Sequence, residues 1–507
     1  NKSTTIFGNI VAFDESPKND QLLYVGTDDG LIQVTTDGGA TWNKKETFPV
    51  VPAMTYVNML WASQHDANVV YATFNNHKRG DFKPYIMKSV DKGNTWTALQ
   101  NDLPERGTVY SIAEDHVDPM LLFAGTEFGC YVSVNGGQNW VKLSAGLPTI
   151  CVRDMAIQKR ENDLVLGTFG RGFYILDDYS ALRNLTQKDL DRSAKFFPVK
   201  EALAYVESNP LGLRGVGSQG ASMYAAPNPE FGATFTYYVK EKPKSPKEQR
   251  HEQEKKARED GKDIDYPTYE AFVAEDNYEE SYLLFIVKDA AGNEVRKIKS
   301  PATEGVQRTT WNLRYPPTTP IKLSEDKVGR YSHPNEGPLA IPGSYTVELW
   351  KADNGVLESL AEPIAFKVKA LENSSLDRQT VSNIAFKKQV QELRRRILGS
   401  NSELDELNKR LKHVKQAILT YPGADVVWMN DVKALEQNLH DVRIKMWGDF
   451  HKSKRDIETI PGTGGRVENI VNSTWYSTSD PTNTNKEQYS LANEEYVEIR
   501  KDLDSIQ

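Results

Sequence analysis

Four similar apolar segments within the first 180 residues carry polar side chains at equivalent positions. When the segments are superposed, Asn58, Tyr110 and Arg153 share one position, and Ser111 and Asp154 share the next. Because side chains alternate between the two faces of a strand, one of these sets would point toward a common centre. We expect this centre to bind a ligand.

Two arginines are suited to hold an anionic group. Arg153 precedes Asp154, and Arg171 follows the last segment, where other segments have a glycine nearby. A guanidinium group there could hold a carboxylate or a sulfate by a bidentate contact. The alternative is that Arg153 or Arg171 pairs with Asp177 or Asp178 and fixes the last segment in place.

The acidic residues of this region could support hydrolysis of a glycosidic bond. That reaction requires two carboxyl groups, roughly 5–5.5 Å apart for retention or 6.5–9.5 Å apart for inversion. Asp28 and Asp29 precede a glycine and are typical of a turn, whereas Glu114 and Asp115 end a strand. We expect no catalytic pair within residues 1–180 and assign no catalytic residue. The other acids considered are Glu127 and Asp154.

Neither the histidines nor the glycines match a metal or cofactor motif. His65, His77 and His116 lie in different segments, and no HxxxH or HExxH spacing occurs. The glycine-rich stretch 167–172 leads into another strand rather than a helix, unlike a nucleotide-binding loop. The sequence therefore predicts no metal and no cofactor.

The elements that must position these residues repeat along the chain. Each segment is an apolar strand, a turn and a second strand that ends in threonine. Successive threonines are 46, 53 and 42 residues apart, which is the length of one four-stranded propeller blade. The segments are 10–27, 57–73, 109–126 and 152–168, and they end at Thr27, Thr73, Thr126 and Thr168.

A second motif follows three of the four segments. It contains Ser or Thr, then Asp or Asn, one or two glycines, and a final Trp. The Asp or Asn side chain can accept hydrogen bonds from its own turn, and glycine provides a positive φ. We expect each motif to close a hairpin and its Trp to plug the edge of the sheet. These structural residues are Asp37, Trp42, Asp91, Trp96, Asn135 and Trp140.

The motif resembles the Asp-box, or BNR, repeat Ser/Thr-x-Asp-x-Gly-x-Thr-Trp of sialidases, family 74 xyloglucanases and sortilin/Vps10 receptors. The stretch 167–178 looks most like large bacterial sortilin-like proteins that are often labelled glycosyl hydrolases. The resemblance implies a β-propeller over residues 1–180, in which the Asp-box is structural and lies away from the central site. The absence of Arg-Ile-Pro from the sequence disfavours a sialidase.

Four blades are fewer than the related propellers have, and propellers generally close with roughly four to eight blades. We therefore expect a partial propeller. The remaining blades would lie N-terminal to Asn1 or on a further chain.

A different β pattern follows the connector 181–200. Alternating segments within residues 201–370 predict a β-sandwich, interrupted by a charged insertion at 240–265 that should be a solvated helix or loop. The sandwich resembles the immunoglobulin-like module of flagellar hook-capping proteins. The matching stretches are Asp-x-x-Gly-x-x-Val-Arg at 289–296, Trp-Asn-Leu at 311–313 and Pro-Gly-x-Tyr-Thr-Val at 342–347.

Residues 376–507 have helical periodicity. Apolar residues at spacings of three and four predict helices over 386–418 and 432–446, which the break at Tyr421-Pro422-Gly423 makes antiparallel. A further helix is expected from about Lys486 to Ser505. Three tryptophans in this region are expected to be packed in a core rather than to form a ligand groove: Trp428, Trp447 and Trp475.

The composition excludes several classes of protein. The 507 residues have a net charge of −8 and no long basic block, which argues against a nucleic-acid platform. No apolar run approaches the roughly 20 residues of a membrane helix. Cys130 and Cys151 are either free buried thiols or, if neighbouring strands bring them together, a disulfide.

Two functions are consistent with these features. The first is an extracytoplasmic bacterial protein whose sortilin-like propeller binds a peptide or a glycan as part of a larger assembly. The alternative is a polysaccharide-acting glycoside hydrolase of the BNR-propeller type. The appended sandwich and helices favour the first, because they suit a scaffold.

Overall fold

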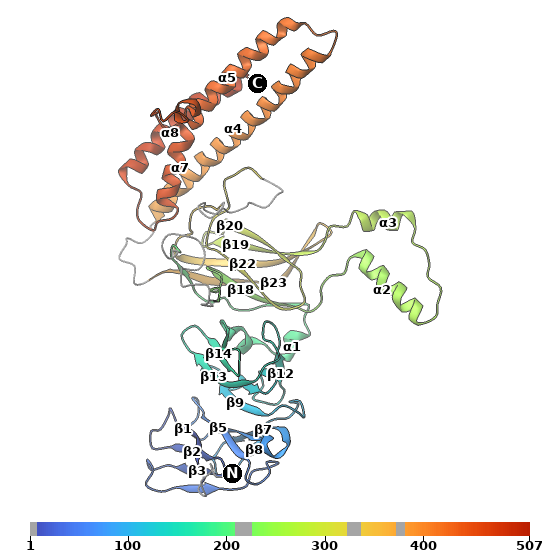
Figure 1. Cartoon of the computed structure of the whole chain (residues 1–507), viewed down its shortest axis with the longest axis vertical. Coiled ribbons are helices and arrows are strands. Elements are labelled where there is room, and N and C mark those ends of the chain that lie inside the picture. The colour runs from blue at the N-terminus through green and yellow to red at the C-terminus, as the bar shows by residue number, and fades with distance from the viewer. Residues whose placement is uncertain (1–7, 208–225, 322–335, 372–380, 507) are drawn as a thin grey trace. The chain divides into compact units, whose positions relative to one another are not determined.

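The structure is a computed structural model that describes residues 8–207, 226–321, 336–371 and 381–506. The chain divides into two compact units, Asn1–Asp191 and Arg192–Gln507, called unit 1 and unit 2 below. Unit 1 consists mainly of β-sheets, and unit 2 contains β-sheets followed by a helical region (Figure 1).

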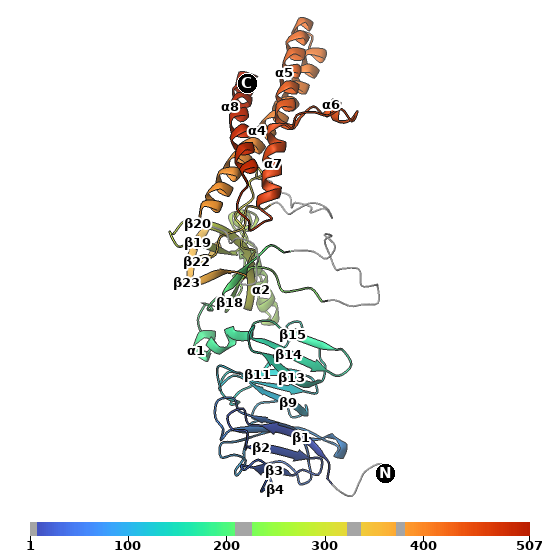
Figure 2. The same cartoon turned by 90° about the vertical axis from the view of Figure 1, so that its left-hand side faces the viewer.

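Unit 1 contains four antiparallel sheets that follow one another along the chain. In each sheet the strands pair in sequence order, as the first sheet shows in Figure 2. The first sheet contains β1 (Ile10–Glu15), β2 (Leu23–Thr27), β3 (Ile32–Thr35) and β4 (Asn43–Lys45); the second, β5 (Tyr56–Ala62), β6 (Val70–Asn76), β7 (Asp81–Ser89) and β8 (Thr97–Ala98). The third contains β9 (Val109–Glu114), β10 (Leu122–Thr126), β11 (Gly129–Ser133) and β12 (Val141–Leu143); the fourth, β13 (Val152–Gln158), β14 (Asp163–Thr168) and β15 (Phe173–Leu176).

The four sheets pack as successive propeller blades. The first strands of neighbouring sheets contact one another, β1 with β5, β5 with β9, and β9 with β13. Three hydrophobic clusters fill the spaces between sheets, and each is built mainly from two consecutive sheets. This arrangement confirms the predicted partial propeller with four blades, and the mainly β class followed by helices is also confirmed.

The same β-bulge occurs in the first strand of every sheet. In the third sheet Val109 pairs with Thr126 and Ser111 pairs with Gly125, so that Tyr110 is the extra residue. The pairing shifts in the same way in the other sheets, which makes the extra residues Val11, Asn58 and Arg153. The superposition of Asn58, Tyr110 and Arg153 made from the sequence is therefore the structural one.

The bulges correct one detail of the repeat. In the second sheet Val57 pairs with Phe74, so Phe74 rather than Thr73 corresponds to the terminal threonines of the other sheets. Strand β6 continues to Asn76. Thr73 therefore matches the terminal threonines in residue type but lies one position before their structural equivalent, Phe74.

The three motifs that resemble the Asp-box close hairpins, as their sequences predict. Asp91 accepts hydrogen bonds from the backbone nitrogen of Thr95 at 2.7 Å, from its hydroxyl at 2.6 Å and from Ser89 Oγ at 2.8 Å. These bonds lower the pKa of Asp91, because they stabilise its charged form. Trp96 and Trp140 are buried, but Trp42 is 40% exposed, so the expectation that each Trp plugs a sheet edge is wrong for Trp42.

A short segment after the fourth sheet completes unit 1. It contains a 3-10 helix at Tyr179–Asn184 and α1 at Gln187–Leu190. Another 3-10 helix, His77–Arg79, connects β6 and β7.

Two sheets of unit 2 pack around one hydrophobic core. The core is rich in aromatic side chains, including Phe235 and Phe285, which stack with ring centroids 6.0 Å apart. One sheet has the order β16 (Ala194–Phe196), β18 (Ala233–Val239), β21 (Gly305–Trp311). The other has the order β17 (Ala202–Ala204), β23 (Val356–Ala370), β22 (Gly343–Asp353), β19 (Tyr282–Asp289), β20 (Glu294–Pro301).

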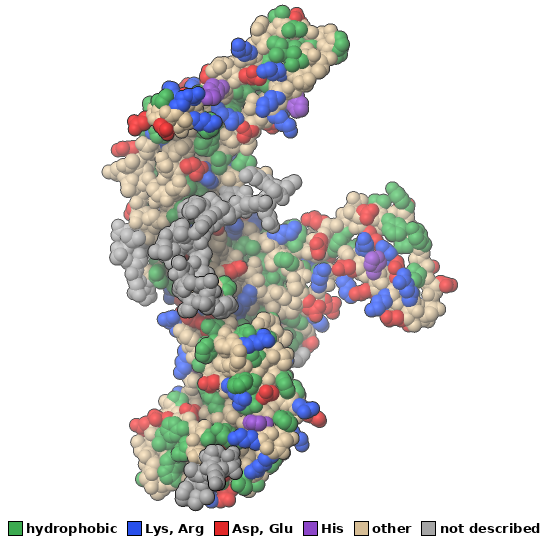
Figure 3. Space-filling model, in the orientation of Figure 1, with side chains coloured by type: hydrophobic (Ala, Val, Ile, Leu, Met, Phe, Trp, Pro, Cys, Tyr) green, Lys and Arg blue, Asp and Glu red, His purple; other side chains and the backbone are tan. Residues whose placement is uncertain are grey.

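The charged insertion between β18 and β19 contains two helices. Helix α2 (Pro246–Glu259) buries no side chain and begins with a capping box, in which Ser245 and Glu248 bond reciprocally to each other's backbone. Helix α3 (Tyr269–Asp276) follows it, and Arg250 of α2 donates to Glu275 of α3 at 2.7 Å. Figure 3 shows basic and acidic side chains interspersed over this region.

The C-terminal region is a helical bundle. Helices α4 and α5 pack against each other, and α7 and α8 pack on both. Helix α7 is additional to the three helices that the sequence predicts. The elements are α4 (Val381–Thr420), a 3-10 helix (Val426–Trp428), α5 (Met429–Trp447), α6 (Phe450–Ser453), α7 (Thr463–Thr474) and α8 (Asn483–Ile506).

The tryptophans of the bundle differ in burial. Trp475 is almost completely buried, as expected for a core residue, whereas Trp428 is about half exposed and Trp447 is partly exposed. The prediction of core packing is therefore wrong for Trp428. No helix in the described part of the chain is long and apolar enough to cross a membrane.

Lys387 of α4 is fully buried where the bundle meets the sandwich. Its ammonium group donates to the carbonyl of Ser477 at 3.0 Å, and Arg314 of the sandwich donates to the carbonyl of Trp475 at 3.2 Å. Burial, together with the charge of Arg314, lowers the pKa of Lys387 from 10.5 to about 8. The folded state therefore disfavours the protonated amine.

This lowered pKa predicts that unit 2 becomes more stable between about pH 8 and 10.5 as the amine loses its proton. Below pH 8 the amine is charged in both the folded and the unfolded state. Burial of this charge then lowers the free energy of unfolding by about 3 kcal/mol. Lys387→Met should remove this pH dependence, measured by urea unfolding followed by circular dichroism at 222 nm. The neighbouring exposed Lys388→Met is the control, and an unchanged pH dependence in Lys387→Met would contradict the assignment.

Candidate functional site

The three bulge residues Asn58, Tyr110 and Arg153 lie next to one another on neighbouring strands. The side-chain nitrogen Nδ2 of Asn58 donates to the carbonyl of Tyr110 at 2.5 Å. The Arg153 guanidinium carbon lies 3.9 Å from the centroid of the Tyr110 ring. A bulge redirects the side chain of its extra residue, and here three successive bulges bring their side chains into one row.

The turns between the second and third strands add two residues to this row. Tyr110 donates its hydroxyl proton to the carboxylate of Glu127, and Arg153 lies 5.4 Å from the ring of Phe169, which is 71% exposed. We call Asn58, Tyr110, Glu127, Arg153 and Phe169 the bulge row.

A repeated backbone bond places these turns beside the bulges. The residue after the terminal threonine donates its backbone N–H to the carbonyl of a residue just before, or at the start of, the first strand. The bonds are Asp28 to Asn9, Glu127 to Thr108 and Phe169 to Cys151. The signal for Glu127 and Phe169 was present in the sequence as the position after threonine. The sequence prediction includes Glu127 only as a possible acid and does not include Phe169 among the site residues.

The bulge row continues into the second sheet. Asn75 donates to the side-chain oxygen of Asn58 at 3.2 Å, and the His77 ring contacts the side-chain oxygen of Asn75. These amide groups hold Asn58 in a defined orientation. The row is therefore built from the second, third and fourth sheets.

Two other predicted residues lie outside this set of contacts. Arg171 is exposed in the turn after β14. Asp154 is exposed on β13, and its carboxylate accepts from the backbone nitrogen of Met155 at 2.9 Å. Their part in ligand binding stays a prediction.

The surroundings of Tyr110 keep its phenol group neutral and hydrogen-bonded to Glu127. Burial, and then the hydrogen bond to Glu127, raise the pKa of Tyr110 well above its usual value. Tyr110 is therefore a phenol that donates a proton to Glu127 at neutral pH. Arg153 supplies a positive charge beside this pair, so the row combines a cation, a carboxylate and an exposed aromatic ring.

Both cysteines of unit 1 are free thiols. Burial raises the pKa of Cys130 to about 12 and that of Cys151, which lies beside Arg153 and Glu127, to about 11. Because the thiolate is the reactive form, neither thiol should react with DTNB at pH 8 in the folded protein. Both should react after unfolding in guanidinium chloride. Rapid labelling of Cys151 in the native state would show that the segment beside Arg153 and Glu127 is accessible to the reagent.

The strand ends away from the bulges carry a buried acidic network. Asp115 accepts from Arg183 at 2.7 and 2.8 Å and from the Tyr179 hydroxyl at 2.6 Å. Burial alone would raise the pKa of Asp115, but these bonds lower it below its usual value. Glu114 is also buried and accepts from Ser63, from the backbone of Gln64 and from Tyr71. Glu114 therefore connects the third sheet to the second, and Asp115 connects the third sheet to the 3-10 helix after the fourth.

Arg183 is the arginine that ties the end of unit 1 to the third sheet. The sequence suggested this role for Arg153 or Arg171, whereas Arg183 lies in the connector and 68 residues from Asp115. No short-range pattern identifies such a pair. Arg153 lies against the rings of Tyr110 and Phe169. Pairing of Arg153 or Arg171 with Asp177 or Asp178 stays a prediction.

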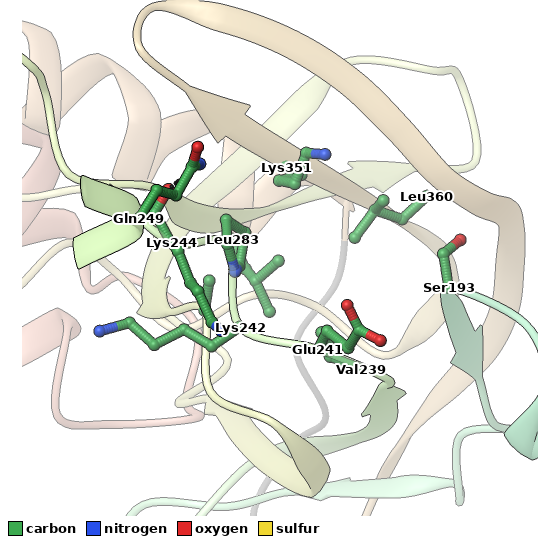
Figure 4. Close-up of a pocket in the computed structure, with 11 residues that line it drawn as sticks. Ser193, Val239, Glu241, Lys242, Lys244, Gln249, Leu283, Lys351 and Leu360 are labelled. Atoms are coloured by element: carbon green, nitrogen blue, oxygen red, sulfur yellow. Dashed lines mark hydrogen bonds between the residues drawn. The ribbon is translucent and has the colours of Figure 1, made fainter. Parts of the chain in front are cut away.

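Unit 2 contains a cavity of about 410 Å³ between the strands and the segment leading to α2. Figure 4 shows Lys242, Lys244 and Gln249 on one side of it, with Leu283 and Lys351 from the sheet. The three lysines could attract an anion, but each already pairs with a glutamate: Lys242 with Glu248, Lys244 with Glu252, and Lys351 with Glu358. Among the described residues, no group of three or more His, Cys, Asp or Glu side chains is arranged to hold a metal ion.

Comparisons with known proteins show distant structural likeness only. No protein-family model and no curated protein matches the chain. A solved structure of a GH74 enzyme from Niastella koreensis is 15% identical with a TM-score of 0.28, over 34% of this chain and 29% of that chain. YCF48 from Cyanidioschyzon merolae is 17% identical with a TM-score of 0.25, over 33% and 53%.

A structure of YCF48 bound to D1 peptide is 12% identical with a TM-score of 0.26, over 46% of this chain and 65% of that chain. The present chain thus spans less than two thirds of the length of each of these three proteins.

Proposed function

We propose that unit 1 is the ligand-binding part of an extracytoplasmic bacterial protein, which binds a peptide or a glycan as one component of a larger assembly. The observation that carries this proposal is the bulge row, in which three equivalent residues of consecutive sheets form one continuous group with Glu127 and Phe169. Converging residues from several sheets are the usual basis of a propeller ligand site.

The chemistry of the row fits a ligand with a negative group and an apolar part. The guanidinium carbon of Arg153 lies 3.9 Å from the centroid of the Tyr110 ring, and the N–H donors of a guanidinium group suit a carboxylate or a sulfate. The exposed ring of Phe169 offers a surface for an apolar side chain or for the face of a sugar. Arg171 and Asp154 would contribute at the edge of the same site.

Binding of the 507-residue chain to peptide and glycan arrays that include carboxylated and sulfated members tests this proposal. For a ligand found in this way, Arg153→Ala should weaken binding roughly tenfold or more by calorimetry, because hydrogen bonds to charged groups are lost. Arg160→Ala is the matched control, since Arg160 is exposed in the turn between β13 and β14 and pairs with Glu161. Equal affinities of the two variants would refute the site.

The alternative activity is glycoside hydrolysis. Asp154 follows Arg153 in the chain, and Glu127 accepts a hydrogen bond from the Tyr110 hydroxyl. Turnover of β-glucan or xyloglucan that disappears in Glu127→Gln or Asp154→Asn would replace the binding proposal with this one. Fractionation of the source cells tests the location, and an exclusively cytosolic pool would contradict it.

A further inference from the structure

The two outermost sheets of unit 1 expose apolar residues that the inner sheets bury. In the fourth sheet Phe173 is 78% exposed and Ile175 is more than half exposed. By strand register, Phe173 corresponds to Ile32, Ile86 and Cys130, because each of these pairs with the residue at the Gly167 position. All three counterparts are completely buried between sheets.

Ile175 follows the same pattern in two of the other three sheets. Its counterparts Val34 in the first sheet and Val132 in the third are both buried in the clusters between neighbouring sheets, whereas the counterpart in the second sheet is the partly buried Lys88. The outward face of the fourth sheet thus has the composition of an interface between blades.

The first sheet shows the complementary pattern on its other side. Ile10 is 67% exposed, whereas its counterparts Val57, Val109 and Val152 are completely buried. Phe13 is also mostly exposed, and its counterparts are buried: Leu60, Ile112 and Met155.

The exposure of Trp42 has the same cause. Trp96 of the second sheet packs in the cluster shared with the first sheet, and Trp140 of the third packs in the cluster shared with the second. Each Asp-box Trp is therefore covered by the preceding sheet, and the described residues contain no sheet before the first.

We propose that both faces dock further four-stranded sheets of the same Asp-box repeat, supplied by polypeptide outside residues 1–507. Three interfaces within unit 1 already join such sheets through equivalent residues, and the exposed faces continue that series. These further sheets would be the partner in the larger assembly of the proposed function, and the proposal rests on that function only for the existence of the assembly.

The fourth sheet also identifies the kind of occupant. It has three strands, whereas each of the other sheets has four. All strands of unit 1, β1 to β15, are already paired within their own sheets, so a second copy could cover the fourth sheet, but the described residues of its unit 1 offer no unpaired strand to complete that sheet. Further repeats can supply both a covering sheet and the missing outer strand. The first and fourth sheets of one chain do not cover each other's outer faces, because both faces are exposed in the same structure.

Site-specific photocrosslinking in the source cells tests the proposal on the natural protein. p-Benzoyl-phenylalanine replaces Phe173 in one variant and Phe13 in another, and mass spectrometry identifies the crosslinked peptide. The expected partner is a peptide from an Asp-box repeat outside residues 1–507. Replacement of Val141, an exposed apolar residue of β12, is the control position.

A second substitution tests the chemistry of the face. Ile175→Glu should lower the crosslink yield from position 173 roughly tenfold, because an apolar contact becomes charged. Crosslinks to a second copy, to other parts of residues 1–507 or to a protein without such repeats would overturn the proposal. So would a yield no higher than that from position 141.

The result can be separated from the ligand site. Arg153→Ala should leave the crosslink unchanged while it weakens ligand binding. A crosslink without ligand binding would refute only the proposed ligand function, and ligand binding without the crosslink would refute only the docking proposal.

Discussion

Asp115→Ala is expected to destabilise unit 1 by about 3–5 kcal/mol, because breaking a buried ion pair leaves an uncompensated charge. Asp115 is fully buried, and Arg183 is mostly buried beside it. The carboxylate also accepts from Tyr179 and from the backbone nitrogens of Val117 and Asp118. Its removal therefore leaves several buried donors without an acceptor.

Hydrogen exchange of peptides from residues 109–126 measures this loss locally, because exchange reports the opening of each segment of the chain. Asp154→Ala removes an exposed carboxylate from the adjacent sheet and should leave exchange unchanged. Equal protection in the two variants would show that the Asp115–Arg183 pair does not hold the sheets together.

The pH dependence of the same pair has a defined sign. The native pKa of Asp115 lies below its usual value of 3.8, so the pair contributes its full stability above that pH. The contribution is lost as the pH falls through the lower native pKa. In Asp115→Ala this part of the acid sensitivity should be absent.

Trp140→Ala is expected to destabilise the third sheet by about 3–5 kcal/mol, which is the usual cost of truncating a buried tryptophan. Trp140 is buried in the cluster between the second and third sheets, and its indole nitrogen donates to the carbonyl of Leu99 at 3.0 Å. Trp42 occupies the same place in its own motif but is partly exposed, and its substitution should cost much less.

Thermal unfolding and hydrogen exchange of the two variants provide a matched comparison. In the isolated 507-residue chain, Trp42→Ala should have the smaller effect. A loss equal to that of Trp140→Ala would mean that the first sheet is already covered.

Much of unit 1 could be predicted because its repeats combine two local signals. Alternating apolar residues define the strands, and the Asp-box turn satisfies its hydrogen bonds within about five residues, as Asp91 does with Ser89 and Thr95. Superposition of these segments also placed Asn58, Tyr110 and Arg153 together.

Register was harder to predict from the sequence. Thr73 matches the terminal threonine in type, but the bulge at Asn58 gives that place to Phe74. A one-residue shift exchanges the faces of a strand, and only pairing with the neighbouring strand decides between the two alignments.

The sequence by itself determined the blade-like sheets, the closing turns and the row of bulge residues, since each depends on contacts within a few tens of residues. Only the tertiary structure decided which tryptophans are buried, which arginine pairs with Asp115, and which apolar faces remain exposed. These depend on what packs against each sheet. That partner lies far away in the sequence for Asp115, and for the outer faces of the first and fourth sheets no part of the described chain provides it.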